Sequence, residues 1–291
     1  MTAALPPEVT AAAALSGRPA GRRNPSLVVG AVLVGLVVLT AVVSFVWTPH
    51  DPTYVDATVR LRGPGSGYWL GTDKFGHDVV SQLMVGSRTT LFVGVVAVGV
   101  AALIGVPLGL LAGMTRGWVS DLVMRALDLL LAFPALLLAI MLGAAFGAST
   151  LTAMLAIGVA TVPSFARITR SGTLQVMATE YALAARAAGR RPVGIALRHV
   201  LPNVSSLVIV QASVSFAIAI LAEAALSFLG FGTPPPTPSW GRMLQESQEL
   251  LFVAPRLALF PGLAIAVAVL GFNLLGDGLR DRLDPRLEDR R

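Results

Sequence analysis

Glu180–Asn203, EYALAARAAGRRPVGIALRHVLPN, is the one long, basic and water-compatible segment between uninterrupted apolar runs. Tyr181–Ala188 is rich in alanine, which favours a helix, and Gly189 is the residue type that ends a helix in the left-handed conformation. A proline three residues later permits a new helix, which we expect from 193 to 200, with Leu201-Pro202-Asn203 as its stop. The stretch therefore predicts two short helices joined by a bend, outside the membrane.

The arginines of this stretch give it a charged side. Arg186, Arg190, Arg191 and Arg198 lie beside alanines and leucines, a combination that suits docking against a protein partner. Arginines next to apolar surface also hold a loop at lipid headgroups. Both roles stay open on these residues alone.

The composition is that of an integral membrane protein. Of the 291 residues, 55% are hydrophobic and 13% are charged, and the mean hydropathy is +0.75, which is far more apolar than a soluble domain. The net charge of +6 does not indicate a nucleic-acid partner, because no basic stripe alternates with aromatic residues. The arginines flank apolar runs instead, as orientation in a membrane requires.

Apolar runs separated by polar turns predict an all-α polytopic membrane protein with six transmembrane helices. We expect these at 27–47, 89–114, 122–146, 151–165 with its flanks, 204–228 and 257–275. The first run exceeds the apolar part of a signal peptide, about 7 to 15 residues, and no Ala-x-Ala site follows it, so we expect an uncleaved span. Residues 1–26 and 279–291 are predicted to be cytoplasmic tails, the first disordered, and 48–87 an extracytoplasmic loop.

The distribution of basic residues indicates the orientation. With both termini in the cytoplasm, 16 of the 22 Lys and Arg residues lie inside and six lie outside, as the positive-inside rule requires. This places Glu180–Asn203 in the cytoplasm. Glycines along the second span favour close packing against another set of helices; they are Gly94, Gly99, Gly105 and Gly109.

The chemistry excludes ATP hydrolysis by this chain. A phosphate-binding loop needs a lysine after a glycine-rich turn, and the single lysine, Lys74, lies in GTDKFG within the expected outer loop. His50 and His77 are expected outside and His199 inside, so the histidines do not converge on one metal or nucleophile. With no cysteine, there is no thiolate either. We expect a non-catalytic chain without a metal or a cofactor of its own.

The central stretch resembles the cytoplasmic motif of permease subunits of bacterial ATP-driven importers, E-A-A, three residues, G, nine residues, I-x-L-P. Ala184, Ala185, Gly189, Leu201 and Pro202 fall on its frame. Leu183 stands at the motif glutamate and His199 at the motif isoleucine, while Glu180 lies one helical turn before Leu183 and could reach the same partner. The resemblance implies ATPase coupling through Glu180, Ala184, Ala185, Arg186, Gly189, Arg190, Arg191, Leu201 and Pro202.

The outer loop resembles the corresponding segment of dipeptide, oligopeptide and nickel permeases, with Gly-Thr-Asp and Gly-x-Asp motifs. These fall on Gly71, Thr72, Asp73, Gly76 and Asp78, and a later Trp-Gly pair on Trp240 and Gly241. Asp73, His77 and Asp78 crowd one turn, and we favour a structural turn over a metal site there.

Glu223 is the acidic residue within the fifth expected span. It begins EAALSFLGFG, which resembles a signature of the same family. Because acids inside membranes are usually partnered, we favour structural pairing over contact with a substrate.

Together these resemblances imply a type I ABC importer permease fold, with the permease core at about 88–278 and a cytoplasmic coupling helix. The implied partners are a homologous second permease, two ATPase subunits or domains carrying ATP and Mg, an extracytoplasmic substrate-binding protein and membrane lipid. The implied location is the bacterial plasma membrane. The implied cargo is a dipeptide or oligopeptide; nickel or glutathione is the alternative, and a secondary transporter is the alternative of a different class.

Overall fold

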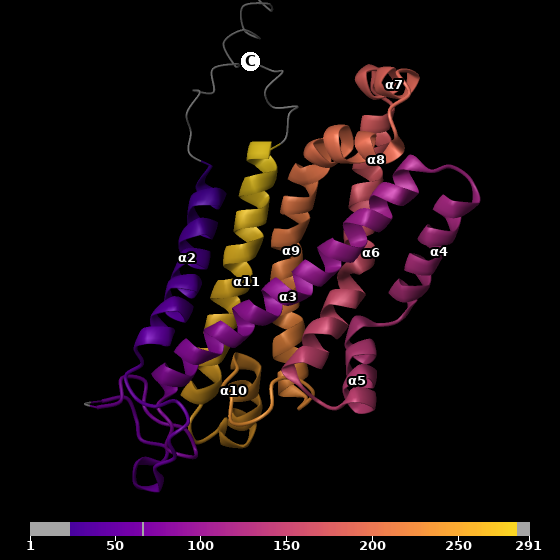
Figure 1. Cartoon of the computed structure of the whole chain (residues 1–291). Coiled ribbons are helices and arrows are strands. Elements are labelled where there is room, and N and C mark those ends of the chain that lie inside the picture. The colour runs from indigo at the N-terminus through magenta and orange to yellow at the C-terminus, as the bar shows by residue number, and fades with distance from the viewer. Residues whose placement is uncertain (1–23, 66, 284–291) are drawn as a thin grey trace, which may run out of the picture.

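The computed structural model describes residues 24–65 and 67–283, and its regular structure over that range is helical. The helices, labelled as in Figure 1, are α2 (Pro25–Val46), α3 (Val79–Met114), α4 (Trp118–Ala132), α5 (Ala135–Phe146), α6 (Thr150–Met177), α7 (Glu180–Ala187), α8 (Pro192–Ile195), α9 (Leu201–Phe228), α10 (Trp240–Ser247) and α11 (Arg256–Leu283), with short turns η1 (Ala57–Val59), η2 (Ala196–Val200) and η3 (Gln248–Leu250). Five of the described helices are long and apolar enough to cross a membrane, or six spans if α4 and α5 are one bent span. The expected all-α membrane fold is confirmed; most of the expected tails, 1–23 and 284–291, lies outside the described residues.

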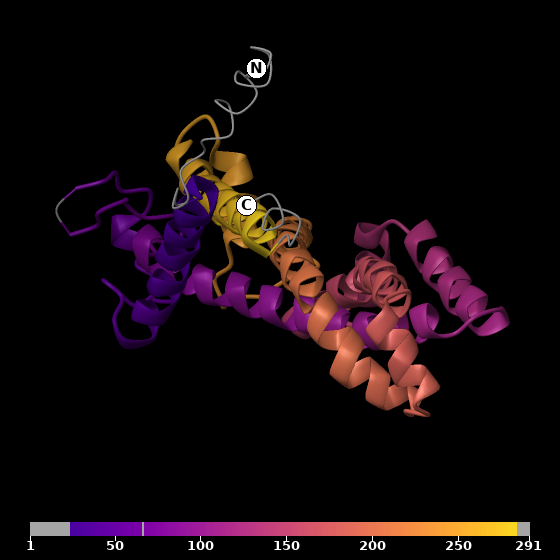
Figure 2. The ribbon, with the colours of Figure 1, turned by 90° about the horizontal axis from the view of Figure 1, so that it is seen from above.

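The helices form a bundle with two distinct ends (Figure 1). α2, α11 and α9 lie side by side, and α3 crosses them diagonally and packs most extensively along α6. α7 and α8 lie at the end where α2 begins and α11 finishes, whereas α10 and the loop after α2 lie at the other end. Seen along the bundle, α4 stands at the opposite side from α2 (Figure 2).

α3 begins at Val79, ten residues before the expected Thr89, so the outer loop ends at Asp78 rather than at 87. The Asp78 carboxylate accepts a hydrogen bond from Ser81 N at 3.0 Å and caps the helix. The predicted start is wrong because the expected span was limited to the charge-free run from Thr89, whereas the helix includes the charged residue Arg88. Its guanidinium lies 4.1 Å from the centre of the Phe45 ring, so α2 holds the charge within the bundle.

α3 and α6 touch along a seam of glycines. A Cβ on Gly105 would lie 2.6 Å from Phe165 Cβ, and one on Gly113 would lie 2.6 Å from Thr173 Cβ. Gly109, between them, is equally close to the α6 backbone at Ala166. The close packing expected of the α3 glycines is thus made within the chain. It does not extend to Gly99, which faces open space.

The third expected span, 122–146, is broken. α4 and α5 meet at an angle of 81°, and Phe133 and Pro134 separate them. A proline removes a backbone donor and disfavours the helical conformation of the residue before it. The expected third span is therefore not one continuous helix, although α4 and α5 together can count as one bent span.

The helix stop expected at Leu201-Pro202-Asn203 is also wrong, because Pro192–Phe228 forms one helical run of 37 residues. Residues 196–200 form a π-turn in which Leu201 N–H bonds to Ala196 O. Pro202 lies in the first turn of α9, directly after this π-turn, where its missing N–H costs little. α8 therefore continues into α9 without a loop.

α11 continues to Leu283, beyond both the expected end at 275 and the expected tail start at 279. Arg280 and Arg282 lie in its last turn, where positive charge stabilises the helix terminus. Asp281 accepts a hydrogen bond from Asn24 Nδ2 at 2.9 Å, which ties the end of α11 to the start of α2.

Candidate functional site

The bend between α7 and α8 is set by the backbone at Gly189. Its φ is +73°, the left-handed conformation expected from the sequence. Gly189 N–H bonds to Arg186 O at 3.0 Å and Arg190 N–H bonds to Ala185 O at 3.2 Å, the two hydrogen bonds of a Schellman helix end. The predicted helix end is confirmed.

The bent pair is anchored to the bundle by a small apolar core. Ile195 and Val200 are buried against Val176 of α6 and Val204 of α9, and Ala182 of α7 is buried as well. The bent pair therefore contacts α6 and α9 directly.

The outward side of the pair mixes apolar and cationic side chains. Leu183 is 50% exposed and Val193 is 67% exposed. Ala184 is exposed, and so are all four arginines expected on the cationic side: Arg186, Arg190, Arg191 and Arg198. Within the described part of the chain none of these arginines has an acidic partner at salt-bridge distance. Exposed apolar side chains are typical of a surface that binds a partner, and the neighbouring arginines would attract a partner of complementary charge.

Leu183 and His199, the two residues that depart from the motif, lie at or near this surface. Glu180 and Leu183 are both exposed on α7, so a partner that reaches one can reach the other. His199 is half-buried, with its ring 6.1 Å from that of Tyr181. Of the two motif residues after it, Leu201 packs on the apolar core and Pro202 is exposed.

The outer motif forms a tight loop at the opposite end. Gly71 and Gly76 have φ values of +82° and +91°, and a side chain on either would strike the backbone of the preceding loop segment. Thr72 is buried, accepts a hydrogen bond from Arg62 N at 2.9 Å and donates one to Val59 O. These residues fix the path of the loop before α3 begins.

Asp73 is the polar centre of that loop. Its carboxylate accepts hydrogen bonds from Phe75 N at 2.8 Å, His77 N at 2.9 Å, His77 Nδ1 at 2.7 Å and Gln82 Nε2 at 3.2 Å. Burial raises the pKa of Asp73, but the hydrogen bonds and charge of His77 outweigh it and leave the pKa below its ordinary value. The same hydrogen bond raises the pKa of His77 against the opposing effect of burial.

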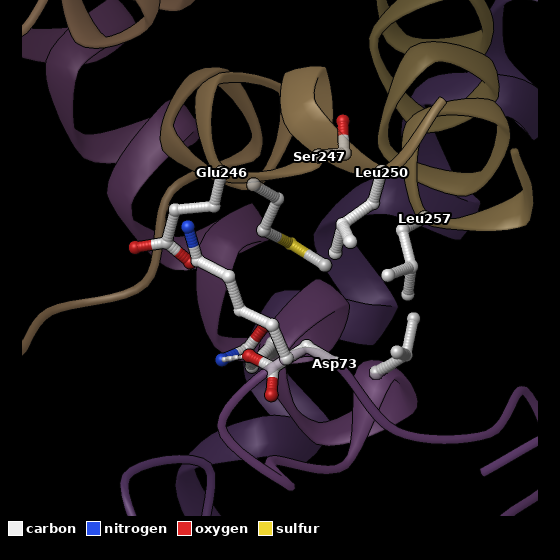
Figure 3. Close-up of a pocket in the computed structure, with 9 residues that line it drawn as sticks. Asp73, Glu246, Ser247, Leu250 and Leu257 are labelled. Carbon is white, nitrogen blue, oxygen red and sulfur yellow. Dashed lines mark hydrogen bonds between the residues drawn. The ribbon is translucent and has the colours of Figure 1, made fainter. Parts of the chain in front are cut away.

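Asp73 also faces the α10 end of the molecule. It lines a cavity of about 10 Å³ together with residues of α10, η3 and α11. Figure 3 shows Asp73 on one side of this cavity, with Glu246, Ser247, Leu250 and Leu257 around the rest of it. Asp78 caps α3 through one carboxylate oxygen, which lies 3.5 Å from His50 Nδ1. Both aspartates thus hold the turn through hydrogen bonds, and no group of three or more His, Cys, Asp or Glu residues within 24–65 and 67–283 is placed to bind a metal.

Trp240 and Gly241 join α10 to the spans. The indole Nε1 of Trp240 donates to Leu83 O at 3.0 Å, and the ring fills the space beside Gly86 of α3. Gly241 lies so close to Ala224 of α9 that a side chain has no room there. The pair therefore fixes α10 against both helices.

Glu223 is 1% exposed on α9. Its Oε1 accepts a hydrogen bond from Ser227 Oγ at 2.7 Å, and Ser227 Oγ in turn accepts from Thr233 N at 3.1 Å. Its partners here are a hydroxyl and, through it, the loop after α9.

A cavity of about 400 Å³ lies between α5, α6 and α9. Its polar lining consists of Thr161, Ser164, Gln211 and Ser215. Sequence reasoning missed these residues because isolated Ser, Thr and Gln residues in apolar runs carry no spacing signal, and the bend that brings α5 to them was not expected.

Comparison with known proteins agrees with this geometry. Residues 105–289 match the family model of the binding-protein-dependent transport system inner membrane component. The chain is 40% identical over 267 residues to a dipeptide transport system permease protein of Alkalihalophilus pseudofirmus, covering 92% of this chain and 88% of that one. It is 42% identical over 263 residues to a glutathione transport system permease protein of Pectobacterium atrosepticum, covering 89% and 87%.

A solved structure shares the fold. The inward-facing MetNI methionine ABC transporter has a chain that superposes with a TM-score of 0.59 at 19% identity, covering 70% of this chain and 96% of that chain. With a family model matched over more than half of its length and relatives at about 40% identity, this chain belongs to the family of binding-protein-dependent transport system inner membrane components.

Proposed function

We propose that this chain is one permease subunit of an ATP-driven importer of dipeptides or oligopeptides in a bacterial plasma membrane. It would form half of the passage, beside a homologous second permease. Two ATPase subunits or domains would bind ATP and Mg, and an extracytoplasmic binding protein would deliver the cargo. The dipeptide permease at 40% identity supports the choice of cargo.

The observation that carries this proposal is the exposed bent pair α7 and α8. It combines arginines that have no acidic partner among the described residues with exposed apolar side chains, at one end of the bundle. A groove on an ATPase is the partner that such a surface fits. Because α8 continues into α9 without a loop, closure of the ATPases would move a helix that crosses the membrane.

Glutathione is the second candidate for the cargo, because a relative at 42% identity carries that name. Affinities of the cognate binding protein for dipeptides, glutathione and Ni²⁺ separate the candidates. Tightest binding of a dipeptide supports the proposal, and tightest binding of glutathione or of Ni²⁺ replaces its cargo.

Reconstitution tests the importer itself. The chain alone in liposomes should move no peptide, and uptake should appear when the second permease, the ATPases, ATP and the binding protein are added. Peptide flux through the lone chain, driven by a proton or sodium gradient and indifferent to ATP, would instead make it a secondary transporter.

A further inference from the structure

The cavity between α5, α6 and α9 is lined by fourteen residues, none of which is ionisable. Ten are apolar, among them Leu136, Ile157 and Leu221, and the other four are the hydroxyl and amide side chains already named. The lining therefore offers hydrogen bonds without fixed charge.

The polar groups lie at mid-depth. Thr161 and Ser164 fall near the middle of α6, and Gln211 and Ser215 lie near the centre of α9. Ala135, which begins α5 directly after the bend, lines the same cavity. Three elements thus converge at one level between the two ends of the bundle.

Lipid is a poor occupant of this cavity. Ser164 is exposed and Gln211 is half-exposed. Gln211 Nε2 donates to Ser215 Oγ at 3.0 Å, but the amide oxygen of Gln211 is left without a described donor. A polar group without a partner is costly in hydrocarbon, so this surface fits water or a polar cargo.

We propose that this cavity is the section of the passage that contacts cargo, and that Gln211, Ser215, Thr161 and Ser164 bind the main-chain amides of a peptide regardless of side-chain charge. This rests on the proposed import function. An amide and three hydroxyls both donate and accept, as peptide N–H and C=O groups require, while the apolar lining receives apolar side chains. The lining has no imidazole, carboxylate or thiolate to select a transition-metal ion, which favours a peptide over nickel.

Charge introduced at residue 211 tests the proposal in the complete transporter. Uptake of a neutral, a lysine-containing and a glutamate-containing dipeptide is measured for the natural chain, Gln211→Lys, Gln211→Glu and Gln211→Met. Gln211→Lys should lower lysine-peptide uptake relative to the neutral peptide by roughly five- to thirtyfold, as for like charges about 8 Å apart at an effective dielectric constant of about 20 to 40. Gln211→Glu should do the same to the glutamate peptide.

Gln211→Met is the neutral control, which should slow all three peptides without changing their ratios. Because the binding protein is the same throughout, a change in ratio reports on the permease. Unchanged ratios in both charged variants would overturn the proposal.

A cysteine variant covers the case in which charged variants do not assemble. In the complete transporter, Ser164→Cys should react with a small water-soluble thiol reagent, and transported dipeptide should slow the reaction. Ile209→Cys, on α9 and 48% exposed but outside the cavity lining, should stay unreactive. If neither cysteine reacts, the cavity faces lipid and the proposal is wrong. Failure of the import function is separate: it would appear as an absence of ATP-driven peptide uptake in the natural complex.

Discussion

Gly189 determines whether α7 and α8 can fold back on each other. Apart from its chain neighbours, no described residue has an atom within 4 Å of the position that a Cβ would take there, but its φ is +73°. A side chain at residue 189 would therefore have room, and glycine is required only because of the left-handed backbone conformation. This is the kind of residue that a sequence can reveal, since the helix formers before it, the glycine and the following proline are local signals.

Replacing Gly189 by valine should disturb coupling without disturbing the spans. A β-branched residue in the left-handed region costs about 1 to 3 kcal/mol, so we expect weaker assembly with the ATPases, or ATP hydrolysis that no longer depends on substrate. Hydrolysis and uptake by the reconstituted complex measure this. Gly194→Val, in α8 with open space and no positive φ, is the matched control, and normal coupling in Gly189→Val would argue against a role for the bend.

The His77–Asp73 pair should make the outer loop sensitive to pH. The pKa of His77 is raised above 6.5 and that of Asp73 is lowered below 3.8. The contribution of His77 to stability is therefore complete below pH 6.5 and is lost as the pH rises through its raised pKa, while that of Asp73 is lost only below 3.8. Glu246 supports the charged imidazole and Arg242 opposes it.

Hydrogen exchange of the loop from 48 to 78 at about pH 6 and about pH 8.5, corrected for the intrinsic rate, measures this effect. Protection should fall at the higher pH in the natural chain and should be low at both in His77→Gln. The same pH dependence in both proteins would assign it to another group.

At the scale of elements, the sequence predicted that helices exist better than it predicted where they begin or bend. Long apolar runs predicted the spans because hydropathy is a property of the whole segment. The start of α3 depends on one capping carboxylate at Asp78, and the break before α5 depends on Pro134. Both are single residues, and a hydropathy average does not register them.

The site divides in the same way. Gly189 and the exposed arginines follow from local sequence. The contacts of Trp240 with Leu83 and of Glu223 with Ser227 and Thr233 depend on tertiary packing, as does the cavity between α5, α6 and α9, and no local pattern predicts them.

Packing of α3 on α6 should tolerate a side chain at Gly99 but not at Gly109. Gly109 is in contact with the α6 backbone, and a Cβ added to it would lie 2.6 Å from Thr169 Cβ, whereas Gly99 faces open space. Gly109→Leu should destabilise the chain by about 1 to 3 kcal/mol, the usual cost of overpacking, while Gly99→Leu should have little effect. Thermal unfolding in detergent compares the two, and equal stability would contradict the seam.

At the scale of the whole molecule, the two ends of the bundle should face opposite sides of the membrane. The α7–α8 end carries Arg191, and the other end carries the exposed loop residue Thr237. Since the natural chain has no cysteine, single cysteines report on the two sides without background.

Arg191→Cys should be protected from an impermeant thiol reagent in intact cells, and Thr237→Cys should react, because the positive-inside rule places the arginine-rich end in the cytoplasm. Lysed cells, in which both should react, are the control. The reverse labelling in intact cells would invert the orientation.

The glycine seam between α3 and α6 bears on which helices can move relative to one another. The backbones of α3 and α6 approach closely at Gly105, Gly109 and Gly113, so sliding or rotation of one helix against the other would bring their atoms into collision, and we expect the two helices to move together. The cavity on the other face of α6 has α5 and α9 as its remaining walls. If the passage widens and narrows during a cycle, we therefore expect α5 and α9 to change position relative to the pair α3 and α6.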